Sequence, residues 1–248
     1  MDLPAIGYDN YLTHSGVTPT GDGTNPEYAY NWRTDDAWTT GAASGYIEAD
    51  MTTSHSPDYF AVVGHTLGTR SATIKLQYWT GAAYADIPEA TATPSDDTAI
   101  MVVFTPVAAT KFKLVVTTDG TAVTIAVASF GEVTTLERGL RGGYAPPPLA
   151  RQDVYLNNIS QSGAFTGRSL VRTGCSGQLA LSNLSQDWVR VTLDPFITAS
   201  RTQGWFLLWL EERRPLEAAY CWTTTAPQPS EMGDGQMACT IDYRGTVE

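Results

Sequence analysis

The feature that most constrains the fold is a strict alternation of apolar and polar side chains in short segments of the first half. In residues 73–79, Ile74, Leu76 and Tyr78 face one side, while the residues between them are polar. Alternation with a period of two is typical of a half-buried strand. A period of two also occurs in 112–116, where Lys113 and Val115 lie between other apolar residues, and in 123–127, where the intervening residues are small. No helical spacing of comparable strength occurs here, so the sequence predicts an antiparallel β-sandwich.

The second half combines strands with one helical patch. Ser185 is a suitable N-cap, Pro195 interrupts the helical spacing, and Asp194 is expected to cap a second short helix. Residues 205–210 (WFLLWL) are a continuous apolar run, which favours a strand covered on both faces. Residues 236–244 alternate and predict a closing strand. The sequence therefore predicts a C-terminal β-sandwich with one short helix. The residues that follow the helical spacing are Trp188, Val189, Thr192, Leu193, Phe196 and Ile197.

A Gly- and Pro-rich segment divides the chain. Residues 138–150 contain three glycines followed by Pro146, Pro147 and Pro148, a composition that predicts an extended, polyproline-like linker. The predicted organisation is an N-terminal arm, a β-sandwich domain, this linker and an oligomerisation domain, with boundaries at 1–23, 24–137, 138–150 and 151–248. A short strand in the N-terminal arm is suited to pair with either domain.

Charge and cysteine content narrow the classes of partner. The 248 residues carry a net charge of −11, and residues 1–140 account for 6 − 16 = −10 of it, which disfavours binding to nucleic acid. No apolar run approaches the ~20 residues that a membrane span needs, and the first residues do not resemble a signal peptide. Three cysteines predict reduced thiols in a cytoplasmic product, and pairing of Cys221 with Cys239 is left open.

Two resemblances rest on motifs along the chain. Residues 24–135, from TNPEYAYNWRTDDAWTT through ATIKLQYW to VTIAVASFGE, resemble the discoidin domain, a galactose-binding-like jelly roll. The whole chain is similar to a two-domain protein of bacteriophage tail tips, through IGYDN, NNISQSGAFTGRSLVR, WFLLWL, AAYCWTT and a last strand ending in Gly245. In better-known distal tail proteins the ring domain comes first. Here the order is reversed, so their ring contacts do not transfer to this sequence.

The tail-tip resemblance implies where the protein acts and with what. It implies a virion component assembled in the host cytoplasm and located at the tail tip. The second domain would form a ring with copies of itself and contact tail tube, hub and fibre proteins. The first domain would face outward and assist attachment to cell-surface glycan. The alternative function is a carbohydrate-binding adhesin without a scaffold role.

The candidate binding residues are aromatic side chains and arginines. Trp79, Tyr84 and Tyr30 lie in or beside predicted loops, where an aromatic ring can stack on a sugar, although such rings are also common in a core. Tryptophan and arginine are enriched at protein interfaces, although charged runs are also common as solvated turns. The predicted interface residues are Arg168, Arg172, Arg190, Arg213, Arg214 and Trp209.

Catalytic and metal-binding motifs find little support. Asp35 and Asp36 are the candidate calcium ligands, but two adjacent carboxylates supply too few ligands alone and also suit a solvated turn. The histidines and cysteines lack zinc-site spacing. Residues 174–178 (GCSGQ) lack the spacing of a nucleophile elbow and are expected to form a hairpin turn. The sequence thus predicts a protein that is not an enzyme and holds no cofactor.

Overall fold

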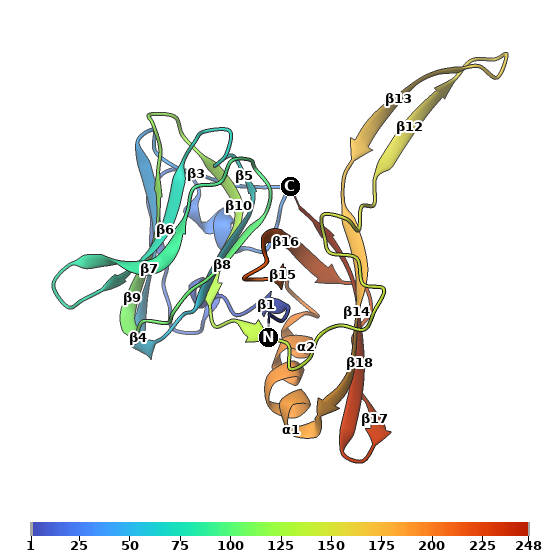
Figure 1. Ribbon diagram of the computed structural model, residues 1–248. Helices are drawn as coiled ribbons and strands as arrows, with labels where there is room; N and C mark the ends of the chain where they lie inside the picture. The colour runs from blue at the N-terminus through green and yellow to red at the C-terminus, as the bar shows by residue number, and fades with distance from the viewer. Residues whose placement is uncertain (1, 248) are drawn as a thin grey trace.

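The computed structural model describes residues 2–247 as a stack of antiparallel sheets (Figure 1). A five-stranded sheet packs on a four-stranded sheet, the four-stranded sheet packs on a seven-stranded sheet, and a helical segment covers the far face of the last. The predicted fold class, mainly β with one short helical segment, is confirmed. None of the helices formed by residues 2–247 has the length and apolar character needed to cross a membrane.

The first two sheets enclose one core in the manner the alternation predicts. Ile74 and Leu76 are fully buried, whereas Lys75 and Gln77 lie on the outer face. The five-stranded sheet has the order β2 (Thr20–Gly21), β4 (Ser44–His55), β9 (Ala109–Thr117), β6 (Thr73–Trp79) and β7 (Tyr84–Ala92). The four-stranded sheet has the order β3 (Trp38–Thr39), β10 (Thr124–Gly131), β5 (Tyr59–His65) and β8 (Ile100–Val103), and two 3-10 helices, η1 (Tyr11–Thr13) and η2 (Pro26–Tyr30), lie beside these sheets.

The seven-stranded sheet joins both ends of the chain. Its order is β11 (Thr134–Thr135), β1 (Ala5–Gly7), β15 (Trp205–Leu210), β16 (Arg214–Thr223), β18 (Gln236–Thr246) and β14 (Cys175–Ser185), and β17 (Ser230–Gly233) pairs with β18. In β1, Ile6 pairs with Leu207 of β15. The short strand of the N-terminal arm therefore belongs to the sheet of the second half. The sequence had left open whether this strand pairs with the first or the second domain.

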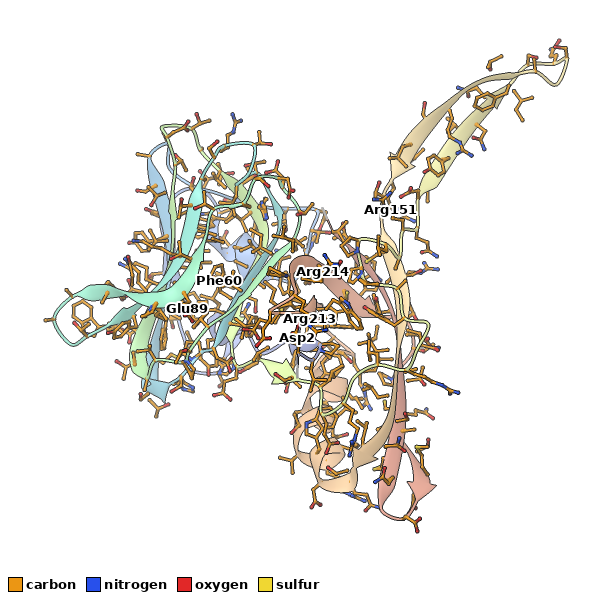
Figure 2. The ribbon with its side chains drawn as sticks, viewed as in Figure 1. Asp2, Phe60, Glu89, Arg151, Arg213 and Arg214 are labelled. Atoms are coloured by element: carbon orange, nitrogen blue, oxygen red, sulfur yellow. The ribbon has the colours of Figure 1, made fainter. Side chains whose placement is uncertain are left out.

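The four-stranded sheet is buried on both faces. In β5, Phe60 and Val62 belong to the core shared with the five-stranded sheet, and Phe60 is labelled in Figure 2. The intervening residues of β5 contact the seven-stranded sheet, where they pack with Phe206 and Tyr220. A partly buried hydrogen bond reinforces this junction, because the Tyr220 hydroxyl donates to the Trp32 carbonyl at 2.7 Å. The two halves of the chain thus share an apolar core between the four-stranded and the seven-stranded sheet.

The helical segment is continuous and does not break at the proline. It runs through α1 (Gln186–Trp188), a π-helical stretch η3 (Val189–Leu193) and α2 (Asp194–Ala199). Ser185 caps it as predicted, since its Oγ accepts the Trp188 N–H at 3.3 Å. The helical segment does not break at Pro195, and Asp194 does not cap it, because the N-cap of α2 is Leu193; α2 does begin at Asp194 with Pro195 in its first turn, as the sequence predicts. The π-helical stretch places its widened turn where a proline removes one N–H from the hydrogen-bond ladder.

Residues 138–150 pack against the second half instead of forming an extended spacer. Leu140 and Tyr144 contact the core of the seven-stranded sheet, and the Arg141 N–H donates to the Ala180 carbonyl at 3.2 Å. The prolines form a turn, because the N–H of Leu149 donates to the Pro146 carbonyl at 2.9 Å. This segment therefore runs beside β14. Two of its apolar side chains pack against the core between the seven-stranded sheet and the helical segment.

The expected hairpin turn at GCSGQ is also wrong. Residues 175–178 lie inside β14 and pair with β18, so that Gly177 is opposite Tyr243. A Cβ on Gly177 would lie 2.5 Å from the Tyr243 hydroxyl oxygen. Glycine occurs here because an aromatic ring covers the strand, and not because the chain turns.

Candidate functional site

A two-stranded hairpin projects from the body beside β14 (Figure 1). It consists of β12 (Val154–Ile159) and β13 (Phe165–Arg172), and we call residues 154–172 the projecting hairpin. Every residue of both strands is exposed except Gly167, which is half-buried. A two-stranded hairpin without a second layer is only marginally stable in water. The fold therefore leaves this element without a second layer to pack against.

The projecting hairpin carries an unusual concentration of exposed apolar side chains. Leu156, Ile159, Phe165 and Val171 are between 58% and 67% exposed. The complete set of its exposed large apolar residues is Val154, Tyr155, Leu156, Ile159, Phe165, Leu170 and Val171. Apolar residues occur on both faces, since the neighbours Tyr155 and Leu156 point in opposite directions. Clusters of this kind mark surfaces that bind another molecule.

Arginine side chains accompany the apolar ones. Arg168 donates to the Asn157 side-chain oxygen at 2.8 Å, and its guanidinium lies 4.2 Å from the centre of the Tyr155 ring. Arg172 ends β13, and Arg151 lies at the base of the hairpin (Figure 2). The cross-strand contacts hold Arg168 along the hairpin, where its charge remains exposed to solvent.

The other predicted interface residues lie elsewhere. Arg190 is on the helical segment and donates to the Gln186 side chain at 3.0 Å. Arg213 and Arg214 are exposed at the turn between β15 and β16. Trp209 is half-buried, with its ring centre 4.6 Å from that of Tyr144. The structure thus brings together only Arg168 and Arg172 on the hairpin, and Arg213 and Arg214 on the turn; their interface role stays a prediction.

Two of the three aromatic residues proposed for carbohydrate binding contact each other. Trp79 and Tyr84 flank the tip of the β6–β7 hairpin, with ring centres 5.1 Å apart. The Lys113 ammonium lies 4.0 Å from the centre of the Tyr84 ring and therefore occupies one of its faces. Burial, followed by the adjacent Glu48 carboxylate, raises the pKa of Tyr84. Trp79 is thus the ring of this pair that keeps more freedom to stack on a ligand.

Tyr30 lies apart from that pair. It ends η2 and packs, half-buried, against the core of the first sandwich, and this burial raises its pKa. No ring contact joins Tyr30 to Trp79 or Tyr84 among the residues that the structure describes. Carbohydrate binding by these three residues stays a prediction.

The two candidate calcium ligands form hydrogen bonds within their own turn. Asp36 accepts from the Asn31 side-chain amide at 3.0 and 3.1 Å, and Asp35 pairs with Arg33 at 2.6 Å. The Arg33 guanidinium lowers the pKa of Asp35. Within residues 2–247 no group of three or more His, Cys, Asp or Glu side chains is arranged to hold a metal ion.

The cysteines lie in the seven-stranded sheet without disulfides. Cys175 and Cys221 are both opposite Gly245 of β18, one on each neighbouring strand. Cys239 pairs with Leu181 farther along β18, so the arrangement does not oppose it to Cys221. All three are free thiols, and burial raises the pKa of Cys221. The sequence left open whether Cys221 and Cys239 form a disulfide. In the structure they do not, and the strand register does not place them opposite each other.

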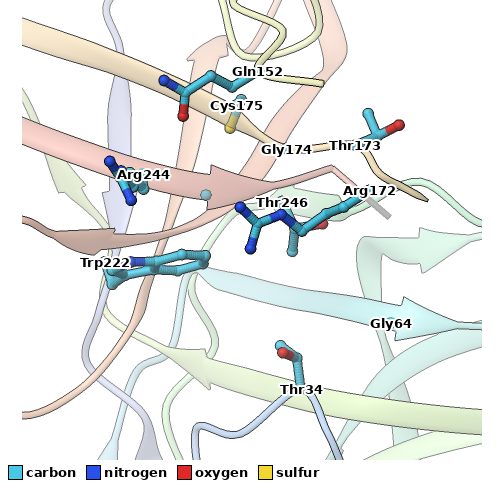
Figure 3. A pocket seen from close by; sticks show the side chains of 11 residues that line it. Thr34, Gly64, Gln152, Arg172, Thr173, Gly174, Cys175, Trp222, Arg244 and Thr246 are labelled. Carbon is cyan, nitrogen blue, oxygen red and sulfur yellow. The ribbon is translucent and has the colours of Figure 1, made fainter. Parts of the chain in front are cut away.

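A pocket of about 390 Å³ opens where the hairpin base meets the two sheets (Figure 3). Arg172, Trp222 and Arg244 contribute the largest side chains, and Cys175 lies at its wall. Its lining residues include neither a carboxylate nor a histidine. General acid–base catalysis requires a positioned proton donor and acceptor. This pocket offers a cationic, aromatic surface without such a pair.

The sequence patterns missed the exposed apolar residues of the hairpin. In the structure, β13 pairs with the preceding strand β12 and not with β14, which follows it. The available signal was the apolar content of both faces of 154–159, where Tyr155 and Leu156 are neighbours. A strand with two apolar faces is normally covered on both sides. Here neither side is covered by the same chain.

Comparisons with known proteins give partial matches only. No protein-family model matches the chain, and a search of curated proteins finds no match. Among solved structures, a Ruminococcus gnavus fucosidase in complex with fucose matches at 17% identity, covering 51% of this chain and 27% of that one, with a TM-score of 0.42. A Clostridium perfringens family 32 carbohydrate-binding module in complex with GalNAc-β-1,3-galactose matches at 16% identity, covering 46% and 94%, with a TM-score of 0.38. A chitosan-binding module from Paenibacillus matches at 12% identity, covering 49% and 96%, with a TM-score of 0.39.

Proposed function

We propose that this protein is a structural component of a phage virion at the tail tip or baseplate, and that it forms a ring through its second half. The observation that carries the proposal is the projecting hairpin, which exposes seven large apolar side chains. Burial of one such side chain contributes roughly 1.5–3 kcal/mol. A partner that covers several of them gains a large association energy, and copies of the same chain supply that partner in a homo-oligomer.

The geometry of the hairpin favours a ring over a two-fold dimer. The hairpin leaves the body on one side (Figure 1), so it would contact a different surface of the neighbouring copy. Head-to-tail contacts of this type close into rings when the rotation between copies permits it. Tail tube, hub and fibre proteins would contact such a ring, and the five-stranded sheet would face outward toward the host surface. In this role the protein is a scaffold and not an enzyme.

Polar substitutions on the projecting hairpin test the ring. We expect the double substitution Ile159→Asp and Phe165→Asp, a cross-strand pair, to convert the assembly into monomers because it places two charges in the buried contact. Native mass spectrometry of the full chain measures the result. Val191→Asp with Met232→Asp is the matched control, because these two exposed apolar residues lie outside the hairpin. A wild-type chain that remains monomeric and is absent from virions contradicts the proposal.

A second candidate function is carbohydrate binding by the first half. The contact between Trp79 and Tyr84 favours it, because a half-buried aromatic pair at a hairpin tip is a suitable surface for stacking on a sugar ring. Polar partners lie nearby, since Lys113 pairs with Glu48 at 3.1 Å. In that case the protein acts as an adhesin, with or without a ring.

Removal of the freer ring tests this second function. We expect Trp79→Ala to weaken glycan binding by roughly tenfold, equivalent to ~1.4 kcal/mol of lost stacking. A glycan array with the full chain identifies the ligand, and calorimetry then measures both affinities. Trp222→Ala is the control, because Trp222 is an exposed tryptophan in the second half. An array without any bound glycan contradicts carbohydrate binding and leaves only the scaffold.

A further inference from the structure

An apolar groove of about 420 Å³ lies where β7 and β8 meet the turn between β15 and β16. Both halves of the chain contribute to it. Ile100 and Val102 come from β8, while Leu208 and Leu216 come from the seven-stranded sheet. Leu216 is 78% exposed, the highest value among the large apolar residues that the structure describes. The groove therefore presents apolar surface to solvent at the junction of the two halves.

Three glutamates lie at this groove. Glu89 comes from β7, and Glu211 and Glu212 come from the β15–β16 turn; all three are exposed. Figure 2 shows Glu89 on one side of the junction and Asp2, Arg213 and Arg214 on the other. Partial burial, followed by the nearby carboxylates of Asp2, Glu212 and Glu89, raises the pKa of Glu211. Glu89, Glu211, Glu212 and Asp2 outnumber the two arginines of the same turn, Arg213 and Arg214, so a segment that brings positive charge and apolar side chains would complement this groove.

The backbone at the groove is also suited to receive an extended segment. β8 is the edge strand of its sheet and pairs only with β5 within residues 2–247. An unpaired strand edge offers backbone groups to a strand from another chain. Strand addition of this type combines main-chain hydrogen bonds with side-chain pockets on either side.

The projecting hairpin has the matching chemistry. Between residues 151 and 173 the chain holds three arginines, Arg151, Arg168 and Arg172, and one acidic residue, Asp153, giving 3 − 1 = +2. Arg168 and Arg172 lie on β13 among exposed apolar side chains, while β12 carries exposed apolar side chains and no arginine. In Figure 1 the hairpin leaves the body beside β14 and runs away from β8, so it does not fold back onto the groove of its own chain.

We propose that the groove between β8 and the β15–β16 turn receives the projecting hairpin of a second copy of this chain. The inference rests on the proposed ring, and it identifies the two surfaces that meet in it. Apolar hairpin residues fill the groove beside Leu216, and the hairpin arginines face the three glutamates. Because donor and acceptor surfaces differ, each copy uses its hairpin on one neighbour and its groove on the other.

Cross-linking between two single variants tests the contact directly. One sample carries Leu170→Cys on the hairpin and the other carries Leu216→Cys in the groove, both at exposed positions. The three native thiols are buried, so oxidation reports on the new ones. We expect a disulfide-linked dimer when the two proteins are mixed and oxidised. Mixing Leu170→Cys with Met232→Cys, which lies on β17, is expected to give little cross-linking.

A groove variant separates this inference from the ring itself. We expect Leu216→Asp to convert the assembly into monomers, as the hairpin substitutions do, while Met232→Asp leaves it intact. If the hairpin substitutions abolish the ring but Leu216→Asp does not, and no mixed disulfide forms, the groove is not the acceptor and the ring stands. If the wild-type chain is monomeric, both the ring and the acceptor groove are wrong.

Discussion

Replacement of Phe206 by alanine is expected to lower the free energy of unfolding of the whole chain by about 3–5 kcal/mol. Phe206 is fully buried, and its ring centre lies 5.1 Å from that of Tyr220. It packs against Ala61 and Val63 of β5, which belong to the other half of the chain. The cavity that the substitution creates therefore lies in the core that joins the two halves. Against a typical stability of about 5–15 kcal/mol, this is a large loss.

The form of the unfolding curve is as informative as its midpoint. Because both halves contribute to the damaged core, we expect one transition that moves as a whole, measured by urea denaturation with tryptophan fluorescence and circular dichroism. Phe165→Ala on the projecting hairpin is the control, since Phe165 is 67% exposed and its removal is expected to change monomer stability by less than about 0.5 kcal/mol. Two separate transitions, only one of them shifted by Phe206→Ala, would contradict a shared core.

The strands of the five-stranded sheet were predictable where they have one buried and one solvated face, as β6 and β9 do. In β9, Phe112 and Leu114 are buried while Lys111 and Lys113 lie outside, and the period of two is visible in the letters alone. The same holds for β18, where Cys239, Ile241 and Tyr243 are buried in alternation. Local patterning carries this information because solvent contacts the second face.

The arrangement of the two halves was not predictable from such patterns. Residues 59–63 form a continuous apolar run, which indicates a strand buried on both faces but does not say what covers the second face. Here the cover comes from Phe206 and Tyr220, more than 140 positions later. The continuity of the helical segment at Pro195 likewise depends on a π-helical stretch, which no residue pattern predicted.

The candidate binding surfaces divide in the same way. The contact of Trp79 with Tyr84 could be predicted from the sequence, because both residues flank the tip of one hairpin. The groove could not be predicted, because Glu89 and Glu211 come close to each other only when the sheets pack together. The exposed hairpin is an intermediate case, because its apolar residues are visible in the sequence but their lack of cover is a property of the fold.

Gly245 occupies a crowded backbone position in the seven-stranded sheet. It lies in β18 between Cys175 and Cys221, which pair with it from either side. A Cβ at this position would lie 2.5 Å from the Tyr220 carbonyl oxygen and 3.0 and 3.1 Å from the Cys175 and Cys221 sulfurs. The nearest of these atoms is backbone, so a side chain cannot be accommodated by a rotamer change alone. The strand itself has to move.

Gly245→Ala is therefore expected to lower the free energy of unfolding by about 1–3 kcal/mol, and Gly245→Val by more, through overpacking. It should also speed the reaction of the buried thiols with an aromatic disulfide reagent, because displacement of β18 uncovers Cys175 and Cys221. Gly139→Ala is the matched control, since a Cβ there meets nothing within 4 Å. Urea denaturation and thiol kinetics measure the two effects. Equal stability and equal thiol reactivity in Gly245→Ala and Gly139→Ala would show that β18 does not hold the two cysteine strands at this spacing.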